Sequence, residues 1–197
     1  MLIDLHCHTQ PLSACSALTL DALVAAAVHK GLDGLCLTEH DRAWNPIELA
    51  KARERSPIPL FSAVELTTDM GHVLAFGLAG PDRFSAVAQR VFEASRGEGA
   101  LLFLAHPARD GLLKVSHETV EYFESVESQN GSDSRLQNLA AAGLAKGFRL
   151  PGIGGSDAHT REEVGRAATR FDRRMGSDGE LLEALRSGAY QAVSLSL

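Results

Sequence analysis

Short apolar segments alternate with helix-like segments along nearly the whole chain, and this alternation limits the possible fold more than any other feature. The apolar segments predict strands, and the segments between them predict helices. The predicted strands cover residues 2–5, 34–38, 60–65, 73–76, 100–105, 122–127, 167–171 and 190–193. The predicted helices cover residues 20–30, 46–55, 84–96, 134–146 and 178–186. Repeated strand–helix units of this kind pack around a parallel sheet, so we expect an α/β protein.

The length and charge of the chain narrow the class of protein. Its 197 residues are enough for one domain with a proper core and too few for two, so we treat residues 1–197 as a single domain. A formal net charge of −6 provides no basic surface for long nucleic acid, which favours a small ligand. Three cysteines without paired spacing fit a reducing cytoplasm. We expect neither a secretory signal nor a membrane-spanning segment.

Histidines and acidic residues fall at or just after the ends of the predicted strands. Side chains alternate along a strand, so His6 and His8 point to one face and can reach the same metal ion. In α/β barrels the C-terminal ends of the strands gather catalytic groups in one place. The pattern therefore predicts a metal site at that rim, as in metal-dependent hydrolases. The residues at strand ends are His6, His8, Glu39, His40, Glu65, His106, Asp157 and His159, and His72 comes just before a strand.

Six short segments together resemble the polymerase and histidinol phosphatase (PHP) family of metal-dependent phosphoesterases. An ordered set that spans nearly the whole chain is far more specific than a single His-x-His motif. The resemblance implies a distorted seven-stranded (β/α) barrel with two or three divalent metals, zinc, manganese or iron, at its C-terminal mouth. The segments are Ile3-Asp4-Leu5-His6-Cys7-His8-Thr9, Leu37-Thr38-Glu39-His40-Asp41, Val64-Glu65, Gly71-His72-Val73, Ala105-His106-Pro107 and Gly155-Ser156-Asp157-Ala158-His159.

The resemblance also implies three metal positions. Many relatives place an Asp or His after the first motif, where this chain has Cys15 or Ser13. Cys15 is either a thiolate ligand, which would favour zinc, or a bystander. The implied ligands are His6, His8, Glu65 and Asp157 for the first ion, Glu65, His72 and His106 for the second, and His40 and His159, with or without Cys15, for the third.

Several other polar residues near these motifs have more than one interpretation. Asp4 shares the predicted face of the first two histidines and is either an acceptor for an imidazole N–H or a solvated aspartate. Glu39 and Asp41 flank His40. Either one of them orients this histidine or acts as a proton shuttle, or both are solvated carboxylates. Glu127 and Asn130 resemble a family Glu-x-x-Asn segment and are expected to support the ligands or order a loop. Structural or surface positions are expected for His29 and His117.

Clustered divalent ions suit phosphate esters, because two ions about 3.5 to 4 Å apart activate a bridging water and neutralise the phosphoryl oxygens. We therefore expect hydrolysis of a small phosphorylated metabolite, a phosphomonoester or a nucleotide. Arg109 is the candidate for binding phosphate, with a solvated loop arginine as the alternative, and Arg135 and Arg161 are further candidates. The candidate catalytic acids are Glu65, Asp157, Glu39 and Asp41.

Three other functions use the same residues. The first is hydrolysis of a C–N or C–O bond, because the ligands prepare the nucleophile and do not choose the substrate. The second is exonuclease-like activity on nucleic-acid ends, and the third is a metal-binding accessory domain without catalysis. No long insertion separates the motifs, so we expect an open pocket. The substrate and the oligomeric state stay open.

Overall fold

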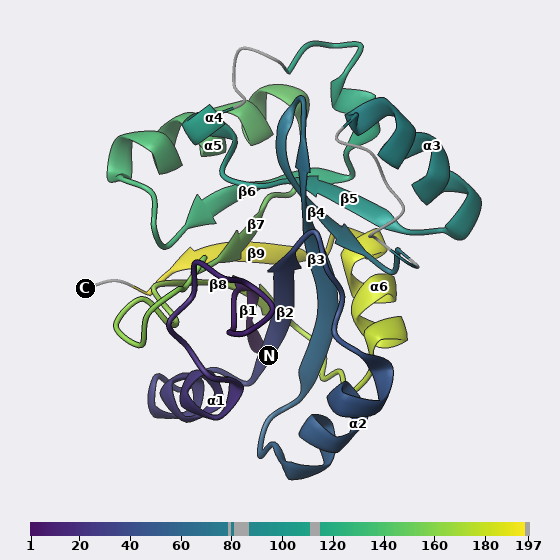
Figure 1. Ribbon diagram of the computed structural model, residues 1–197. Helices are drawn as coiled ribbons and strands as arrows, with labels where there is room; N and C mark the ends of the chain where they lie inside the picture. Colours follow the sequence, from purple (N-terminus) through teal and green to yellow (C-terminus); the bar gives the residue numbers. More distant parts are fainter. Residues whose placement is uncertain (79, 81–86, 111–114, 196–197) are drawn as a thin grey trace.

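A curved sheet forms the centre of the computed structural model of the chain, which describes residues 1–78, 80, 87–110 and 115–195 (Figure 1). Its strands are β1 (Leu2–Cys7), β2 (Gly34–His40), β3 (Leu60–Thr68), β4 (Gly71–Phe76), β5 (Leu101–Leu104), β6 (Ser125–Asn130), β7 (Ile153–Gly155), β8 (Ala167–Phe171) and β9 (Tyr190–Ser194). The order across the sheet is β7-β6-β5-β4-β3-β2-β1-β8-β9.

The sheet is mixed. Strands β1, β2 and β3 pair in parallel, and so do β5, β6 and β7. β4 runs antiparallel to β3 and β5, and β8 runs antiparallel to β1 and β9. The expectation of a wholly parallel sheet is therefore wrong at β4, β8 and β9. The reason at β4 is a tight hairpin, because β3 continues to Thr68 and β4 begins at Gly71, which leaves no room for a crossover helix.

The sheet curls until β7 lies beside β1. The backbone N–H of Asp157 donates to the carbonyl of His6 at 2.7 Å, and the N–H of His8 donates to the carbonyl of Ala158 at 3.1 Å. Lower on the same seam, the Thr169 hydroxyl of β8 donates to the carbonyl of Gly154 at 2.9 Å. The result is a nearly closed barrel, which confirms the predicted distorted α/β barrel, although the sheet of the described residues has nine strands and not the expected seven.

Helices lie outside this barrel, with α1 and α2 on one side and α3 and α5 on the opposite side (Figure 1). None of the helices in the described ranges combines the length and the apolar character needed to cross a membrane. The helices are α1 (Leu20–His29), α2 (Pro46–Arg55), α3 (Ala88–Glu98), α4 (Pro107–Asp110), the 3-10 helix η3 (Val120–Tyr122), α5 (Arg135–Phe148) and α6 (Asp178–Ser187).

The sequence explains most helix boundaries. The Thr19 side chain accepts the N–H of Ala22 at the start of α1, and Asn45 caps α2 ahead of Pro46. The predicted helix over 84–96 is observed from Ala88, and its first residues lie outside the described part of the chain.

The predicted strand over 122–127 begins too early. The strand β6 starts at Ser125, and Tyr122 ends the 3-10 helix η3 instead. The Tyr122 ring packs against Phe92 of α3, with ring centroids 4.8 Å apart. This contact explains why an aromatic residue with high strand propensity lies outside the sheet.

The barrel interior is apolar below the rim and polar at the rim. Along β3, Phe61 and Ala63 belong to the interior core, and Glu65 continues the same face one step higher. Leu181 and Leu185 of α6 belong to the same core cluster, so this helix packs against the apolar interior of the barrel. This alternation delivers a buried carboxylate to the centre of the rim.

Candidate metal centre

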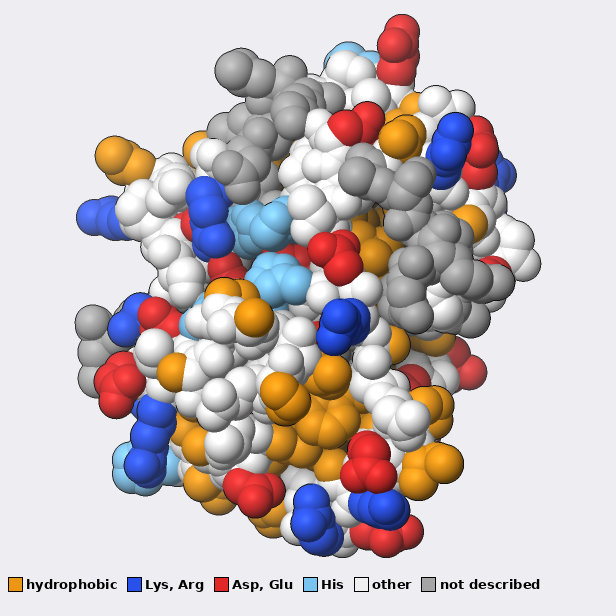
Figure 2. Space-filling model, viewed as in Figure 1, with side chains coloured by type: hydrophobic (Ala, Val, Ile, Leu, Met, Phe, Trp, Pro, Cys, Tyr) orange, Lys and Arg blue, Asp and Glu red, His pale blue; other side chains and the backbone are white. Residues whose placement is uncertain are grey.

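Six of the eight histidines of the chain meet in one hollow at the rim of the barrel, where Figure 2 shows histidine side chains gathered beside acidic ones. Neighbouring imidazole centroids are 4.3 to 6.0 Å apart. The structure thus brings together residues that are up to 153 positions apart in the sequence, from His6 to His159. The six are His6, His8, His40, His72, His106 and His159.

Strand pairing positions three of the candidate ligands. His40 at the end of β2 pairs in register with Glu65 of β3, and His72 of β4 pairs with Thr67. Because β4 is antiparallel, its first residues lie at the rim where the parallel strands end. This direction explains why His72 precedes its strand and still reaches the cluster.

Two further candidates have backbones that only the surrounding structure can hold. His106 and Asp157 have φ values of 25° and 54°, in the region that favours glycine. Such a conformation costs on the order of 1 to 3 kcal/mol in a residue with a side chain. Strain of this kind is common where a side chain must be aimed at a functional site.

Glu65 lies at the middle of the cluster. Burial alone would raise the pKa of its carboxyl, but the charge of His6, the hydrogen bond from His106 and the nearby His40 ring hold that pKa well below its usual range. Glu65 is therefore ionised. Its oxygens lie 2.8 Å from His72 Nδ1, 2.9 Å from His40 Nδ1, 3.0 Å from His106 Nε2, 3.2 Å from His8 Nε2 and 3.3 Å from His6 Nε2.

Asp157 adds a second carboxylate on the side of β7. Its Oδ1 lies 3.2 Å from His8 Nε2, 3.5 Å from His6 Nε2 and 3.8 Å from His159 Nδ1. Burial raises the pKa of Asp157, but the charge of His6 and the hydrogen bond to His8 outweigh burial and lower that pKa. Two ionised carboxylates thus face the same histidines.

The donor set fits divalent cations. Within the described residues no group donates a hydrogen bond to the buried Oε2 of Glu65, although three imidazole nitrogens surround it. The Nε2 atoms of His6 and His8 are 3.1 Å apart, so two lone pairs face each other unless a proton or a cation lies between them. Neutral imidazoles with carboxylates are ligands that suit zinc, manganese and iron.

The ligand atoms form four overlapping groups, in each of which all the atoms lie within 4.8 Å of one another. His8 belongs to two of them, so the third predicted position has His8 as a partner for His40 and His159. The groups are His6-His8-Asp157, His6-Glu65-His106, His40-Glu65-His72 and His8-His40-His159.

Glu127 and Asp4 contact the cluster from behind. Glu127 Oε1 lies 3.0 Å from Nδ1 of His6, which matches the supporting role expected for it. Asp4 accepts the backbone N–H of His6 at 3.2 Å and that of Ser156 at 2.8 Å. Both interpretations of Asp4, as an imidazole acceptor and as a solvated aspartate, are wrong, because it is buried and an irregularity in β1 between Asp4 and Cys7 breaks the simple alternation.

The loop after β1 brings Ser13, and not Cys15, against the ligands. The Ser13 hydroxyl is 3.4 Å from His8 Nδ1 and accepts the N–H of His40 at 3.2 Å. Cys15 is exposed and belongs to none of the four groups. Partial burial and the nearby carboxylates raise the pKa of its thiol, which disfavours the thiolate. Ligation by Cys15 stays a prediction.

Glu39 and Asp41 are structural acceptors. Glu39 is buried, so the idea that it is a solvated carboxylate is wrong. Its oxygens accept hydrogen bonds from the backbone N–H and the hydroxyl of Thr9, from Ser13 and from Trp44. Asp41 is exposed and accepts the N–H and the hydroxyl of Thr67. Both therefore order the rim, and a proton-shuttle role for either stays a prediction.

Arg109 of α4 is anchored beside the cluster. Its Nη2 lies 2.9 Å from Asp157 Oδ2, and its Nε lies 2.7 Å from Asp133 Oδ1. The sequence interpretation missed Asp133, although its place just after β6 was a signal. Arg135 begins α5 and Arg161 follows the last ligand histidine, and both are exposed. Substrate-binding roles for these arginines stay predictions.

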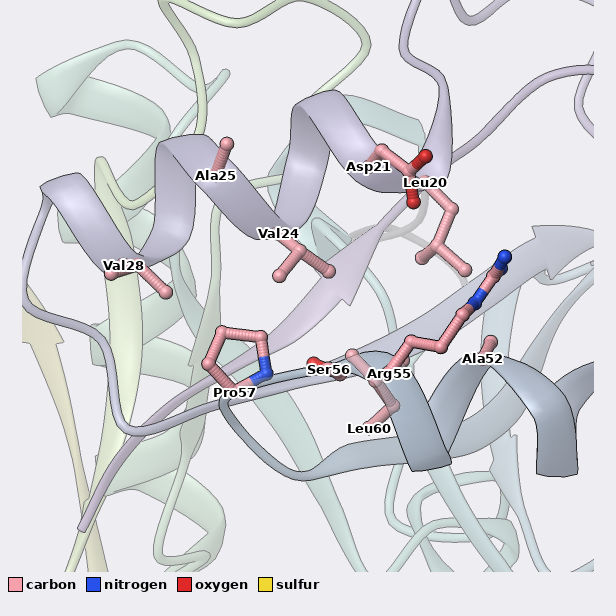
Figure 3. A pocket seen from close by; sticks show the side chains of 10 residues that line it. All are labelled: Leu20, Asp21, Val24, Ala25, Val28, Ala52, Arg55, Ser56, Pro57 and Leu60. Carbon is pink, nitrogen blue, oxygen red and sulfur yellow. The ribbon is translucent and has the colours of Figure 1, made fainter.

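A second hollow lies away from this cluster, between α1 and the end of α2 (Figure 3). It encloses about 420 Å³ and is lined mainly by apolar side chains, among them Val24, Val28 and Leu60. None of the candidate ligands lines it. The chemistry of the chain is thus concentrated at the rim.

Comparisons with known proteins agree with the motif pattern. The chain matches a family model described as PHP-associated over residues 135–190. It is also 35% identical over 78 residues to an error-prone DNA polymerase of Cutibacterium acnes, a match that covers 40% of this chain and 6% of the polymerase. The chain thus corresponds to a small part of that polymerase.

Two solved structures share the fold. One is a two-domain protein of Bacteroides vulgatus that contains a predicted PHP-like metal-dependent phosphoesterase, with 22% identity, a TM-score of 0.73, and coverage of 98% of this chain and 64% of that one. The other is an amidohydrolase of Chromobacterium violaceum with bound sulfate and no metal, with 18% identity, a TM-score of 0.66, and coverage of 98% and 97%. The fold and the two partial sequence matches agree with the resemblance to the PHP family that the ordered motifs indicate.

Proposed function

We propose that the protein is a metal-dependent phosphoesterase that hydrolyses a small phosphorylated metabolite, either a phosphomonoester or a nucleotide. One observation carries the proposal: nitrogens of five histidines lie within 3.3 Å of the Glu65 carboxylate. When bound there, two or three divalent ions would activate water and stabilise the charge that develops on the phosphoryl group.

Different residues of the chain would bind each of these ions, and two residues would be shared between ions. Glu65 has two oxygens and can serve two ions at once, and His8 lies between two groups. The proposed ligands are His6, His8, Glu65 and Asp157 for one ion, Glu65, His72 and His106 for the second, and His8, His40 and His159 for the third.

Electrostatics explains why the substrate would depend on the ions. Glu65 and Asp157 are ionised, and in the metal-free protein the charge of His6 offsets theirs, which leaves no strong attraction for a phosphate. Bound cations would supply the positive charge that a phosphate needs. Arg109 would add a further positive charge, because its guanidinium is held by Asp133 and Asp157 while a third of its side chain stays exposed.

The cluster is open to solvent on one side. The side chains of His40, His72 and His159 are 26%, 30% and 27% exposed, and Figure 2 shows histidine side chains at the surface of the hollow. A phosphate group can therefore approach without a large rearrangement. This access supports a small substrate whose remaining atoms stay outside the barrel.

A substrate panel combined with metal analysis tests the proposal. Protein purified without chelators is expected to contain at least one divalent ion per chain and, with added manganese or zinc, to hydrolyse a phosphomonoester or a phosphodiester. Metal-free protein should be inactive. The proposal fails if no divalent ion binds, or if the metal-loaded protein cleaves an amide and leaves every phosphate ester intact.

The match to a DNA polymerase favours a second candidate, a nuclease-like or accessory role. The net charge of −6 argues against tight binding of nucleic acid, because such binding rests on clustered Lys and Arg. A single-stranded oligonucleotide at low salt decides between the two. Cleavage of the oligonucleotide faster than of a small ester would favour the nuclease role. If the protein neither binds nor cleaves the oligonucleotide, the nuclease role is excluded.

A further inference from the structure

His6 is held from behind by a carboxylate that belongs to none of the four ligand groups. Nδ1 of His6 lies 3.0 Å from Oε1 of Glu127, and both side chains are fully buried. Nε2 of the same ring faces the opposite way, towards Glu65 and Asp157. A ring nitrogen that donates its hydrogen to a carboxylate leaves the other nitrogen with a lone pair, and this lone pair can bind a cation.

The second oxygen of Glu127 is also occupied. Oε2 accepts the backbone N–H of His106 at 2.9 Å and the amide of Asn130 at 2.8 Å. Both oxygens of Glu127 are thus engaged by donors of the protein, and Glu127 is absent from the four ligand groups. Its three contacts instead connect β1, the turn after β5 and the end of β6.

We propose that Glu127 is a positioning residue of the metal centre. It orients His6 so that Nε2 is the ligand atom, and it holds the strained backbone that carries His106. The inference rests on the metal dependence of the proposed function and adds to it a residue outside the ligand set. Partners of this kind typically contribute about 10- to 100-fold to metal affinity, because they fix the ring and raise its basicity.

His8 offers a comparison within the same strand end. Its Nδ1 faces the Ser13 hydroxyl at 3.4 Å, a longer contact to an uncharged group. The support behind His8 is therefore weaker than the support behind His6. Loss of the Ser13 hydroxyl should weaken metal binding less than loss of the Glu127 carboxylate.

The test compares Glu127→Gln and Glu127→Ala with the wild type. The matched control is Glu124→Gln, because Glu124 is exposed and lies just before the same strand. Zinc affinity is measured by competition with a chromogenic chelator. We expect a loss of about 10- to 100-fold in both Glu127 variants, with the larger loss in Glu127→Ala, and no change in the control.

A spectroscopic measurement separates positioning from a general structural role. In zinc-loaded wild-type protein, the proton on His6 Nδ1 is expected as a far-downfield NMR signal, because it is shared with a buried carboxylate. The signal should disappear in Glu127→Ala. If this variant does not fold, Glu127→Gln carries the test, because it preserves the volume of the side chain and should shift the signal upfield.

Three outcomes would overturn the inference. One is zinc affinity within twofold of the wild type in both Glu127 variants. Another is an equal loss of affinity in Glu124→Gln, and the third is an unchanged downfield signal in Glu127→Ala. Wild-type protein that binds zinc but hydrolyses no ester would defeat the proposed function and leave this inference standing. Wild-type protein that binds no divalent ion would defeat both.

Discussion

The buried and open sides of the metal centre hold their histidines differently. We call His6, Glu65 and His106 the buried ligand group, since they are 0%, 0% and 2% exposed. We call His40, His72 and His159 the open ligand group, since about a quarter to a third of each side chain is exposed. The two groups thus differ in burial, and the buried ligand group also contains a carboxylate.

The difference suggests a division of labour. In the buried ligand group, Glu127 contacts both His6 and the backbone of His106, so these ligands keep their geometry without a substrate. The open ligand group faces the solvent from which a substrate arrives. The first proposed ion, which is held by buried ligands alone, should therefore exchange slowly, and the third, which is held by His8 with the partly exposed His40 and His159, should exchange faster.

Glu65→Ala tests whether the two groups depend on one residue, and it should have the largest effect. Its carboxylate contacts histidines of both groups, so its removal should drain metal from both. We expect less than one ion per chain and a loss of activity on the order of 10³-fold or more, since clustered ions supply several kcal/mol of transition-state stabilisation. Elemental analysis and the ester assay measure the result. His117→Ala, outside the cluster, serves as the control and should retain metal and activity.

Removal of metal by a chelator should separate the two groups in time. We expect a fast phase for ions of the open ligand group and a slow phase for the buried ligand group. An ion at about 100 times its dissociation constant stabilises the fold by about 2.7 kcal/mol, so removal of each such ion should lower the melting temperature by about 5 to 10 °C. Time-resolved metal analysis and calorimetry check this. Loss of all ions in a single phase would contradict the expected difference in exchange rate between the two groups.

His106→Ala compared with His159→Ala sharpens the same comparison at single ligands. Loss of His106 removes the buried partner of Glu65 Oε1 and leaves the partly exposed His72 beside that oxygen, whereas water can replace His159 at the exposed edge. We expect metal affinity to fall about 100-fold for His106→Ala, since breaking a contact to a buried charge costs about 3 kcal/mol. For His159→Ala we expect about tenfold. Equal losses in the two variants would contradict the division of labour.

The sequence motifs predicted that these side chains converge, because strand ends in a barrel meet whatever the order of the strands. They did not predict the direction of β4, since a hairpin turn at Asp69-Met70 leaves no periodic signal. The position of His72 at the rim follows from that direction. The alternation rule also failed for Asp4, because β1 is irregular between Asp4 and Cys7.

The supporting contacts were harder to predict than the ligands. Glu127 was expected to help, but its link to His6 joins residues 121 positions apart and depends on how far the sheet curls. The role of Ser13 depends on the path of the loop after β1, which the buried Glu39 sets through Thr9 and Ser13. Loop paths of this kind depend on tertiary contacts and not on local propensity.

Arg109→Ala should lower activity less than the loss of a buried ligand does. Arg109 lies beside the cluster, where it contacts Asp157. The guanidinium contacts Asp157 directly and is partly exposed. A charge-assisted hydrogen bond contributes about 1.5 to 3 kcal/mol, so we expect kcat/KM for a phosphate ester to fall about 10- to 100-fold. Metal content should stay nearly constant. Steady-state kinetics with Arg135→Ala as the comparison measures the effect, and undiminished activity would remove the proposed phosphate contact.

Cys15→Ser should have the smallest effect, and it asks whether the open ligand group recruits a thiolate. The thiol is exposed and lies outside the four ligand groups, whereas the nearby Ser13 hydroxyl contacts both His8 and the backbone of His40. We therefore expect metal content and activity within about twofold of the wild type, as for an exposed side chain with no role in ligation. Ser13→Ala should lower metal affinity more, because it removes the group behind His8.

Cobalt-loaded protein provides a direct measurement, because a thiolate ligand produces an intense charge-transfer band in the near ultraviolet. Such a band in the wild type that disappears in Cys15→Ser would make Cys15 part of the open ligand group, and that group would then hold its ion more firmly than its exposure implies.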